Sequence, residues 1–205
     1  MREYIIRSTQ GAPDWERIPT LAIDIPYLDS PDDIRAFAQI AYSEDALHVH
    51  LVAEEKCIRA EARGPLGCPC EDSCLEFFFC PMEGDDRYFN IEFNLNGCMF
   101  LGFGSGIPSL VRLLPDADPD PFHPTIQKTG SGWEIFYTVP YEFVRRFFPT
   151  FTVESGKTIR ANCYKCSDLT VPAHYFSWNE IIWDEGKGER FTYHKPACYG
   201  KMIFE

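Results

Sequence analysis

Residues 88–96 read YFNIEFNLN, and their apolar and polar side chains alternate without a break. Successive side chains of a β-strand point to opposite faces, so this period of two predicts a strand with two unlike faces. The apolar face comprises Phe89, Ile91, Phe93 and Leu95, and the polar face comprises Asn90, Glu92, Asn94 and Asn96. We expect the first face to pack in a core and the second to present amides and a carboxylate.

Two other segments carry the same alternation. In Cys74–Cys80, three large apolar residues share one face and Glu76 lies on the other. In Thr158–Tyr164, Arg160 and Asn162 lie opposite an apolar face. If these strands share a sheet, their polar side chains form one continuous surface.

Sixteen prolines and fourteen glycines divide the chain into short pieces that are rich in aromatic and β-branched residues. This division into short segments predicts an all-β fold, which we expect to be an antiparallel β-sandwich of the immunoglobulin-like or jelly-roll type. We expect one domain over residues 1–205. The expected strands are Leu21–Ile25, Phe37–Tyr42, Ala46–Ala53, Cys74–Cys80, Tyr88–Asn94, Thr125–Lys128, Trp133–Val139, Thr158–Tyr164, Tyr175–Trp178 and Gly200–Phe204. One short helix is expected at Tyr141–Phe148, between Pro140 and Pro149. The glycine-rich residues 102–106 are interpreted as a loop.

The net charge of −12 disfavours nucleic acid and anionic membranes as partners. The N-terminal residues lack the apolar run of a signal peptide, so we expect a cytoplasmic protein, or an extracellular one if a leader has been removed. Nine cysteines in no recognisable disulfide framework predict reduced thiols. Cys68, Cys70 and Cys74 do not match the usual half-site of a zinc centre, and the alternation directs Cys163 inward, away from Cys166. A pairing of Cys74 with Cys166 stays open.

A series of short segments, in order along the chain, resembles the family 9 carbohydrate-binding modules. They are Trp15 with Ile18-Pro19, Cys70–Phe78, Tyr88–Asn94, Gly97, Trp133-Glu134-Ile135, Val139-Pro140, Arg160–Cys166, Ser177-Trp178, and a closing run from Phe191 through His194-Lys195-Pro196 to Tyr199–Met202. Each segment is short, and their order over nearly the whole chain makes the match specific.

The resemblance implies a β-sandwich related to sugar- and heme-binding extracellular domains that grips sugar between aromatic side chains without cleaving it. The expected ligand is a xylan- or glucan-type oligo- or polysaccharide, including chain ends, and the expected partner is a separate glycan-active enzyme. The expected binding residues are Trp178 as aromatic platform, Glu76, Asn90, Glu92 and Asn94 as the hydrogen-bonding set, and Arg160 with Asn162 beside them. Tyr175, Trp183 and Tyr88 are further candidate platforms. The sequence departs from the family where Cys70 stands in place of an aromatic residue.

Three alternatives stay open at this stage. Glu76 and Glu92 could serve as the carboxyl pair of a xylanase-like glycoside hydrolase. The chain could also be a protein-interaction sandwich that has lost its sugar site. The resemblance further makes a structural calcium ion a candidate, held by Glu71, Asp72 and Glu76 or by Asp116, Asp118 and Asp120.

Overall fold

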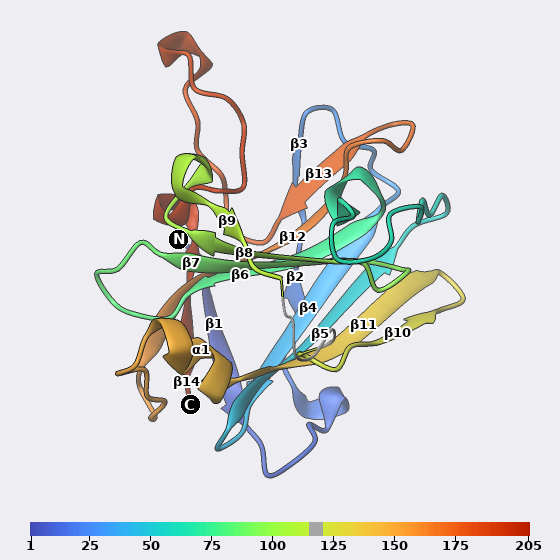
Figure 1. Ribbon diagram of the computed structural model, residues 1–205. Helices are drawn as coiled ribbons and strands as arrows, with labels where there is room; N and C mark the ends of the chain where they lie inside the picture. The colour runs from blue at the N-terminus through green and yellow to red at the C-terminus, as the bar shows by residue number, and fades with distance from the viewer. Residues whose placement is uncertain (115–120) are drawn as a thin grey trace.

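The computed structural model describes residues 1–114 and 121–205 and shows one strongly curled mixed sheet whose two halves face each other (Figure 1). We call the two halves the β5 sheet and the β6 sheet. The β5 sheet contains β1 (Glu3–Ser8), β2 (Leu21–Ala22), β4 (Arg35–Tyr42), β5 (Ala46–Glu54), β10 (Thr125–Lys128) and β11 (Gly132–Pro140). The β6 sheet contains β3 (Ile25–Tyr27), β6 (Cys74–Cys80), β7 (Tyr88–Asn94), β8 (Met99–Gly104), β9 (Val111–Arg112), β12 (Thr158–Ser167), β13 (His174–Ser177) and β14 (Gly200–Phe204). The mostly β architecture is as predicted.

Strand β1 joins the two sheets and makes the fold mixed instead of antiparallel. Residues 3–6 pair in parallel with β14, and Arg7 and Ser8 pair in parallel with β4. The remaining pairings of the described strands are antiparallel, so the predicted purely antiparallel sandwich is corrected at β1 alone. By crossing from one sheet to the other, β1 occupies an edge of each sheet that would otherwise be unpaired.

The main core lies between the sheets and is built by the apolar faces that the alternation predicted. The β6 sheet contributes Leu75, Phe77, Phe79, Phe89, Ile91 and Phe93, and the β5 sheet contributes Val49, Leu51, Ala53, Trp133 and Ile135. Each of these side chains is essentially inaccessible to solvent. At about 1.5–3 kcal/mol for each large apolar side chain, this layer supplies most of the drive for folding.

Helix α1 (Tyr141–Phe147) follows β11 and lies between Pro140 and Pro149, as predicted. The other helical elements of the described residues are single 3₁₀ turns: η1 (Trp15–Arg17), η2 (Pro69–Glu71), η3 (Ile107–Ser109), η4 (Glu185–Lys187) and η5 (Pro196–Cys198). In the described residues, none of the helices is both long and apolar enough to span a membrane.

The glycine-rich residues 102–106 are a strand for half of their length, which corrects their interpretation as a loop. Gly102 and Gly104 lie in β8, where a β-carbon on Gly104 would come within 2.8 Å of Leu110 and Ser109. Glycine is needed at these two positions because β8 and the chain before β9 approach closely and leave no room for a β-carbon. It does not indicate a flexible backbone.

The outer face of the β6 sheet is covered and not solvated. The segment 179–199, red in Figure 1, folds back over it and buries a second apolar cluster with Phe78, Tyr88, Tyr164 and Tyr199. All seven residues of β7 are therefore buried, including the polar ones. The predicted polar face exists, but it lies beneath this segment.

Candidate functional site

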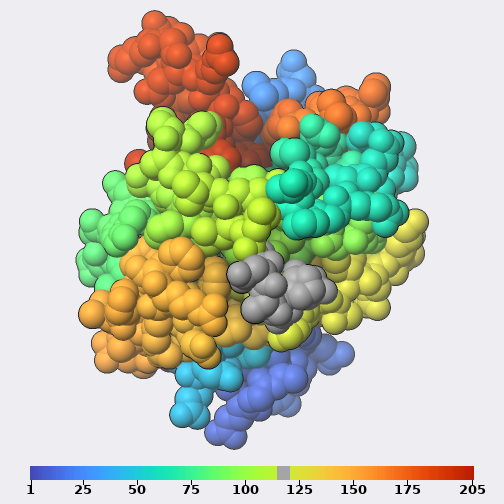
Figure 2. Space-filling view, viewed as in Figure 1, coloured from blue at the N-terminus to red at the C-terminus, as the bar shows by residue number. Residues whose placement is uncertain are grey.

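A pocket of about 370 Å³ opens onto the polar face of the β6 sheet. It is lined by Leu28, Cys70, Glu76, Glu92, Cys166, Asp168, Tyr175, Phe191, Thr192, Tyr193 and His194. Figure 2 shows the segments that contribute these residues, coloured blue, teal, orange and red, meeting at the upper end of the molecule. Four distant parts of the sequence thus form one concave site.

Two carboxylates form the floor of the pocket. Glu76 on β6 pairs directly with Glu92 on β7, and their exposed fractions are 2% and 5%. Burial raises the pKa of Glu76 to about 7. Burial and the neighbouring Glu76 raise the pKa of Glu92 well above its usual range. Because two buried like charges oppose each other, the pair favours holding a proton and can both donate and accept hydrogen bonds.

Asn90 lies on the same face of β7, two residues before Glu92, and is fully buried. Among the described residues, its side-chain nitrogen and oxygen have no hydrogen-bond partner, and neither does Oε2 of Glu76. Buried polar groups are nearly always paired, so Oε2 of Glu76, which lines the pocket, marks a place where another molecule can complete the bonding, whereas Asn90 lies outside the pocket lining.

Aromatic side chains form one side of the pocket. Tyr175 on β13 packs edge to face against Phe191, with ring centroids 5.7 Å apart, and Phe191 packs likewise against Tyr193. The Tyr175 hydroxyl donates a 2.9 Å hydrogen bond to Asp168, which fixes the ring. Tyr175 was among the predicted platforms. Phe191 and Tyr193 were missed as site residues because they lie in a segment without periodicity, although Phe191 belongs to the closing run that carries the family resemblance.

His194 adds a polar group to this wall. Burial lowers its pKa to about 4, so the ring is neutral at pH 7. Its Nδ1 lies 2.7 Å from the Tyr88 hydroxyl, and the neutral ring and the hydroxyl can share this hydrogen bond in either direction. Nε2 is then the donor or the acceptor toward a ligand, according to the tautomer.

Asn94 and Asn162, both predicted to bind ligand, are instead used to hold loops. Asn94 donates to Ala62 and Asp72 and accepts from the backbone of the turn that follows it. Asn162 donates to the carbonyl of Asn179 and accepts from its N–H, which ties the covering segment to β12. Their amides are satisfied by the protein and lie outside the pocket lining.

Trp178 and Arg160 are also placed away from the pocket. Trp178 is 3% exposed and belongs to the core between the sheets, where its ring packs on Gly200, so the structure does not bring this predicted platform to the pocket. Arg160 lies at the far end of β12 and pairs with Asp86 at 2.8 Å. Of the other candidate platforms, Tyr88 is buried and Trp183 packs against Tyr27.

Of the acidic residues proposed for calcium, Asp72 is already engaged within the protein. Asp72 is fully buried, accepts from the N–H groups of Glu61 and Ala62, and pairs with Arg59 at 3.1 Å. It therefore organises the loop before β6 and has an internal counter-charge. Asp116, Asp118 and Asp120 lie outside the described residues.

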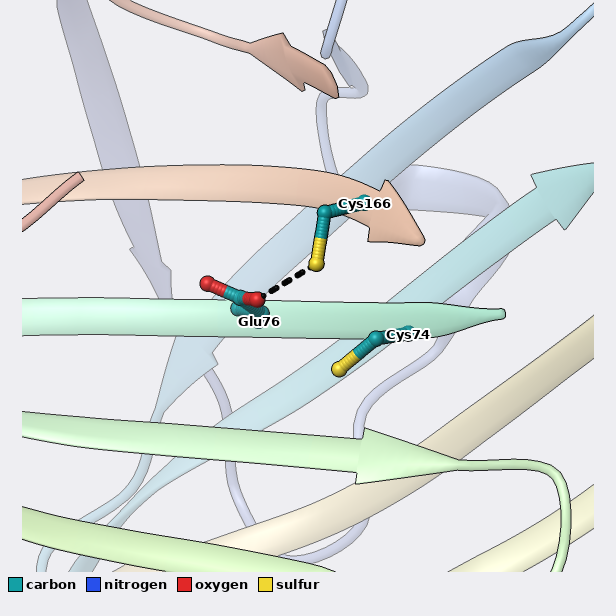
Figure 3. Close-up of side chains that lie close together, drawn as sticks. All are labelled: Cys74, Glu76 and Cys166. Carbon is teal, nitrogen blue, oxygen red and sulfur yellow. Dashed lines mark hydrogen bonds between the residues drawn. The ribbon is translucent and has the colours of Figure 1, made fainter. Parts of the chain in front are cut away.

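Three potential metal ligands meet beside the pocket floor. Cys74 on β6, Glu76 and Cys166 on β12 bring their donor atoms within 4.8 Å of one another, and all three are buried (Figure 3). Cys70 lines the pocket close by, so the position at which the family resemblance led us to expect an aromatic residue does belong to the site. Cys163 lies on the inner face of β12, as its alternation predicted.

A second hollow, of about 1110 Å³, lies over the outer face of the β5 sheet and includes Trp15, Ser43 and His48. It is larger, but the polar side chains of Ser43, Asp45 and His48 within it are already bonded to one another. The His48 ring lies 3.0 Å from the Ser43 hydroxyl, which donates to Asp45. The pocket above Glu76 and Glu92 is therefore the stronger candidate.

Comparisons with known proteins identify the family of this chain. A sequence model of carbohydrate-binding family 9 matches residues 14–204, whereas no curated protein matches the chain. A Bacteroides uniformis protein, described as a candidate carbohydrate-binding protein, is 27% identical with a TM-score of 0.82 over 100% of this chain and 99% of that one. A family 9 module of Caldicellulosiruptor kristjanssonii in complex with glucose has a TM-score of 0.69 at 9% identity, over 100% and 96% of the two chains. The same organism's family 9 module with cellotriose gives 0.67 at 8% identity, over 100% and 94%.

Proposed function

This chain belongs to carbohydrate-binding family 9, and we propose that it binds a sugar, without cleaving it, in the pocket above Glu76 and Glu92. The observation that carries the proposal is the combination of an aromatic side with a floor of incompletely bonded carboxylates. Sugar hydroxyls need several donors and acceptors, and the C–H faces of a pyranose pack on flat aromatic rings. Tyr175 and Phe191 supply the rings, and Glu76, Glu92 and His194 supply the polar groups.

The size of the pocket favours a short ligand or the end of a chain. Its volume of about 370 Å³ lies at the lower end of the usual range for small-molecule sites, roughly 300–1,000 Å³. A gluco-configured sugar is the first choice, because neighbours of the same fold were solved with glucose and cellotriose. Xylo-oligosaccharides are the second choice, since they share the equatorial hydroxyls.

The arrangement of the carboxylates argues against hydrolysis. Glycoside hydrolases place two carboxyl groups on either side of the bond to be broken. Glu76 and Glu92 are direct neighbours on adjacent strands and face the pocket from the same floor. A sugar lying on this floor would meet both groups from one side. The protein is then suited to carry a glycan for a separate glycan-active enzyme.

Calorimetric titration with glucose, cellotriose and xylotriose tests the proposal. We expect Tyr175→Ala to weaken binding by about tenfold or more, because the ring that packs on the sugar is lost. Trp15→Ala is the matched control, since Trp15 is an aromatic residue of the other hollow. Folded wild-type protein that binds none of these sugars would refute the proposal. Binding that is lost in Trp15→Ala and kept in Tyr175→Ala would place the site on the β5 sheet instead.

A further inference from the structure

Two thiols and a carboxylate converge at the edge of the pocket floor. Cys74 and Cys166 are directly opposite each other in the antiparallel pair of β6 and β12, and Glu76 follows Cys74 on the same face of β6. The Cys166 thiol donates a 2.9 Å hydrogen bond to Oε1 of Glu76, and Figure 3 shows both sulfur atoms turned toward this carboxylate. Three donor atoms from two rigid strands are thus held together without help from a mobile loop.

The spacing of the donors suits a tetrahedral metal ion. With metal–sulfur distances of about 2.3 Å, two thiolates on one zinc ion lie roughly 3.7 Å apart. The donor atoms of Cys74, Glu76 and Cys166 are within 4.8 Å of one another, so shifts of about 1 Å or less in side-chain position are sufficient. Thiolate sulfur selects zinc-like ions over calcium or magnesium, which prefer oxygen.

The charge around the cluster independently favours a cation. Glu76 and Glu92 are buried side by side, and the described residues that line the pocket include neither lysine nor arginine. Asp168 adds a third carboxylate to the lining. Oε2 of Glu76 has no hydrogen-bond partner among the described residues. Buried charges are ordinarily paired or bound to metal. Lys165 and Arg112 act on Glu76 and Glu92 only from a distance, and neither forms an ion pair with them.

We propose that Cys74, Glu76 and Cys166 bind one zinc ion, or a similar thiophilic divalent cation, with a fourth position directed toward the pocket. Both cysteines are protonated before binding, so their two thiol protons leave to solvent as the two metal–sulfur bonds form. Glu76 binds as the carboxylate, and the proton that it shares with Glu92 stays on Glu92. Three protein ligands leave one tetrahedral position for water or for a pocket ligand. The proposal goes beyond sugar binding and does not depend on it, because the three ligands come from the protein alone.

A cross-strand disulfide between Cys74 and Cys166 is the competing outcome. It would remove the thiol that donates to Glu76 and leave that buried carboxylate without this donor. It would also leave the paired carboxylates of the floor without a cation. The charge balance therefore favours the metal.

Titration of reduced, metal-stripped protein with cobalt(II) tests the site, because cobalt bound by thiolates in a tetrahedral site has charge-transfer and ligand-field absorption bands. We expect one equivalent to bind and zinc to displace it. Cys166→Ser and Cys74→Ser should each weaken binding by about tenfold or more and reduce the charge-transfer band. Glu76→Gln should keep the sulfur band and lower the affinity.

Cys80→Ser is the matched control, since Cys80 lies on the same strand and face as Cys74 but outside the cluster. It should leave the cobalt spectrum unchanged. Circular dichroism is used to check that each variant is folded. If one of the two cysteine variants does not fold, the other is sufficient for the test. Reduced, folded wild-type protein without a charge-transfer band would overturn the proposal. A band of undiminished intensity and unchanged affinity in a folded Cys74 or Cys166 variant would do the same, by pointing to the exposed thiols of Cys57 and Cys68. Sugar titrations of the same samples report on the proposed function separately.

Discussion

Buried polar side chains gather on both faces of the β6 sheet, and the two groups differ in how they are bonded. On the inner face, Lys165 lies 3.2 Å from Glu55 and 2.7 Å from His174. Glu55 also accepts from Ser73 and from the indole of Trp133. We call Glu55, Ser73, Trp133, Lys165 and His174 the bridge network. The name is used because Glu55 and Trp133 come from the side of the β5 sheet, and Lys165 and His174 come from the β6 sheet.

The outer face carries the pocket floor, which is formed by Glu76 and Glu92, and Asn90 lies buried on the same face of β7 without lining the pocket. There two carboxylates face each other, and Asn90 has no hydrogen-bond partner among the described residues. The depth of burial is about the same in the two groups, with exposed fractions of 0–5%. The two groups differ in their hydrogen bonding. The polar groups of the bridge network are bonded within the protein, whereas those of the floor are fully bonded only when a ligand is present. The first should therefore govern stability and the second binding.

The largest loss of folding stability is expected when the bridge network is broken at Lys165. Lys165→Met keeps the length of the side chain but leaves the Glu55 carboxylate buried without its cation. Removing one partner of a buried pair costs about 3–5 kcal/mol. Urea denaturation should show this loss in the free energy of unfolding. Lys195→Met is the control, because the ion pair of Lys195 with Glu189 lies at the surface and should contribute little. Equal stabilities of the two variants would contradict the distinction.

The contrast between the groups explains what could be predicted from the sequence. Period-two alternation in residues 88–96 correctly separated a core face from a polar face, because strand geometry is local. The prolines around residues 141–147 located the helix for the same reason. Nothing local distinguishes Asn90 from Asn94, however. Asn94 is satisfied by Asp72 and Ala62, which lie more than 20 residues away in the sequence, and Asn90 is not satisfied.

Long-range packing also determines which aromatic residues line the pocket. Trp178 ends a predicted strand and carries the family resemblance, but its ring fills the space beside Gly200 in the core. Phe191 and Tyr193 come from an irregular segment that folds over the β6 sheet and is tied to it through Asn162. No spacing within a single segment could have indicated which aromatic residues would meet Glu76.

The second prediction concerns the pH dependence of the bridge network. Burial and the Lys165 charge lower the pKa of His174 to about 4, from an ordinary value of about 6.5. The folded protein then binds fewer protons than the unfolded chain between these values. The contribution of neutral His174 to stability is therefore complete above about pH 6.5 and is lost as the pH falls toward 4. The charged groups facing the ring are Lys165 and Glu55.

Replacing His174 with glutamine removes this titration while keeping an acceptor for Lys165. Between pH 7 and pH 4, we expect wild type to lose roughly 2–3 kcal/mol more stability than His174→Gln. Urea denaturation across that range, with a chelator present in every sample, measures the difference. His194 also has a lowered pKa, but it is retained in both proteins and cancels. Parallel pH profiles would show that the ring does not titrate as inferred.

The smallest change in free energy is expected at the pocket floor, and it should appear in binding and not in folding. Glu92→Gln keeps the shape of the side chain and removes one of two adjacent buried carboxyl groups, so the free energy of unfolding should stay the same or rise by about 1 kcal/mol. Sugar affinity should fall by about tenfold, since a hydrogen bond to a carboxylate is stronger than one to an amide. Calorimetry and urea denaturation on the same sample separate the two effects. If Glu92→Gln instead destabilised the fold as strongly as Lys165→Met, the floor would be a second structural network, and its unpaired groups would have to be satisfied within the protein.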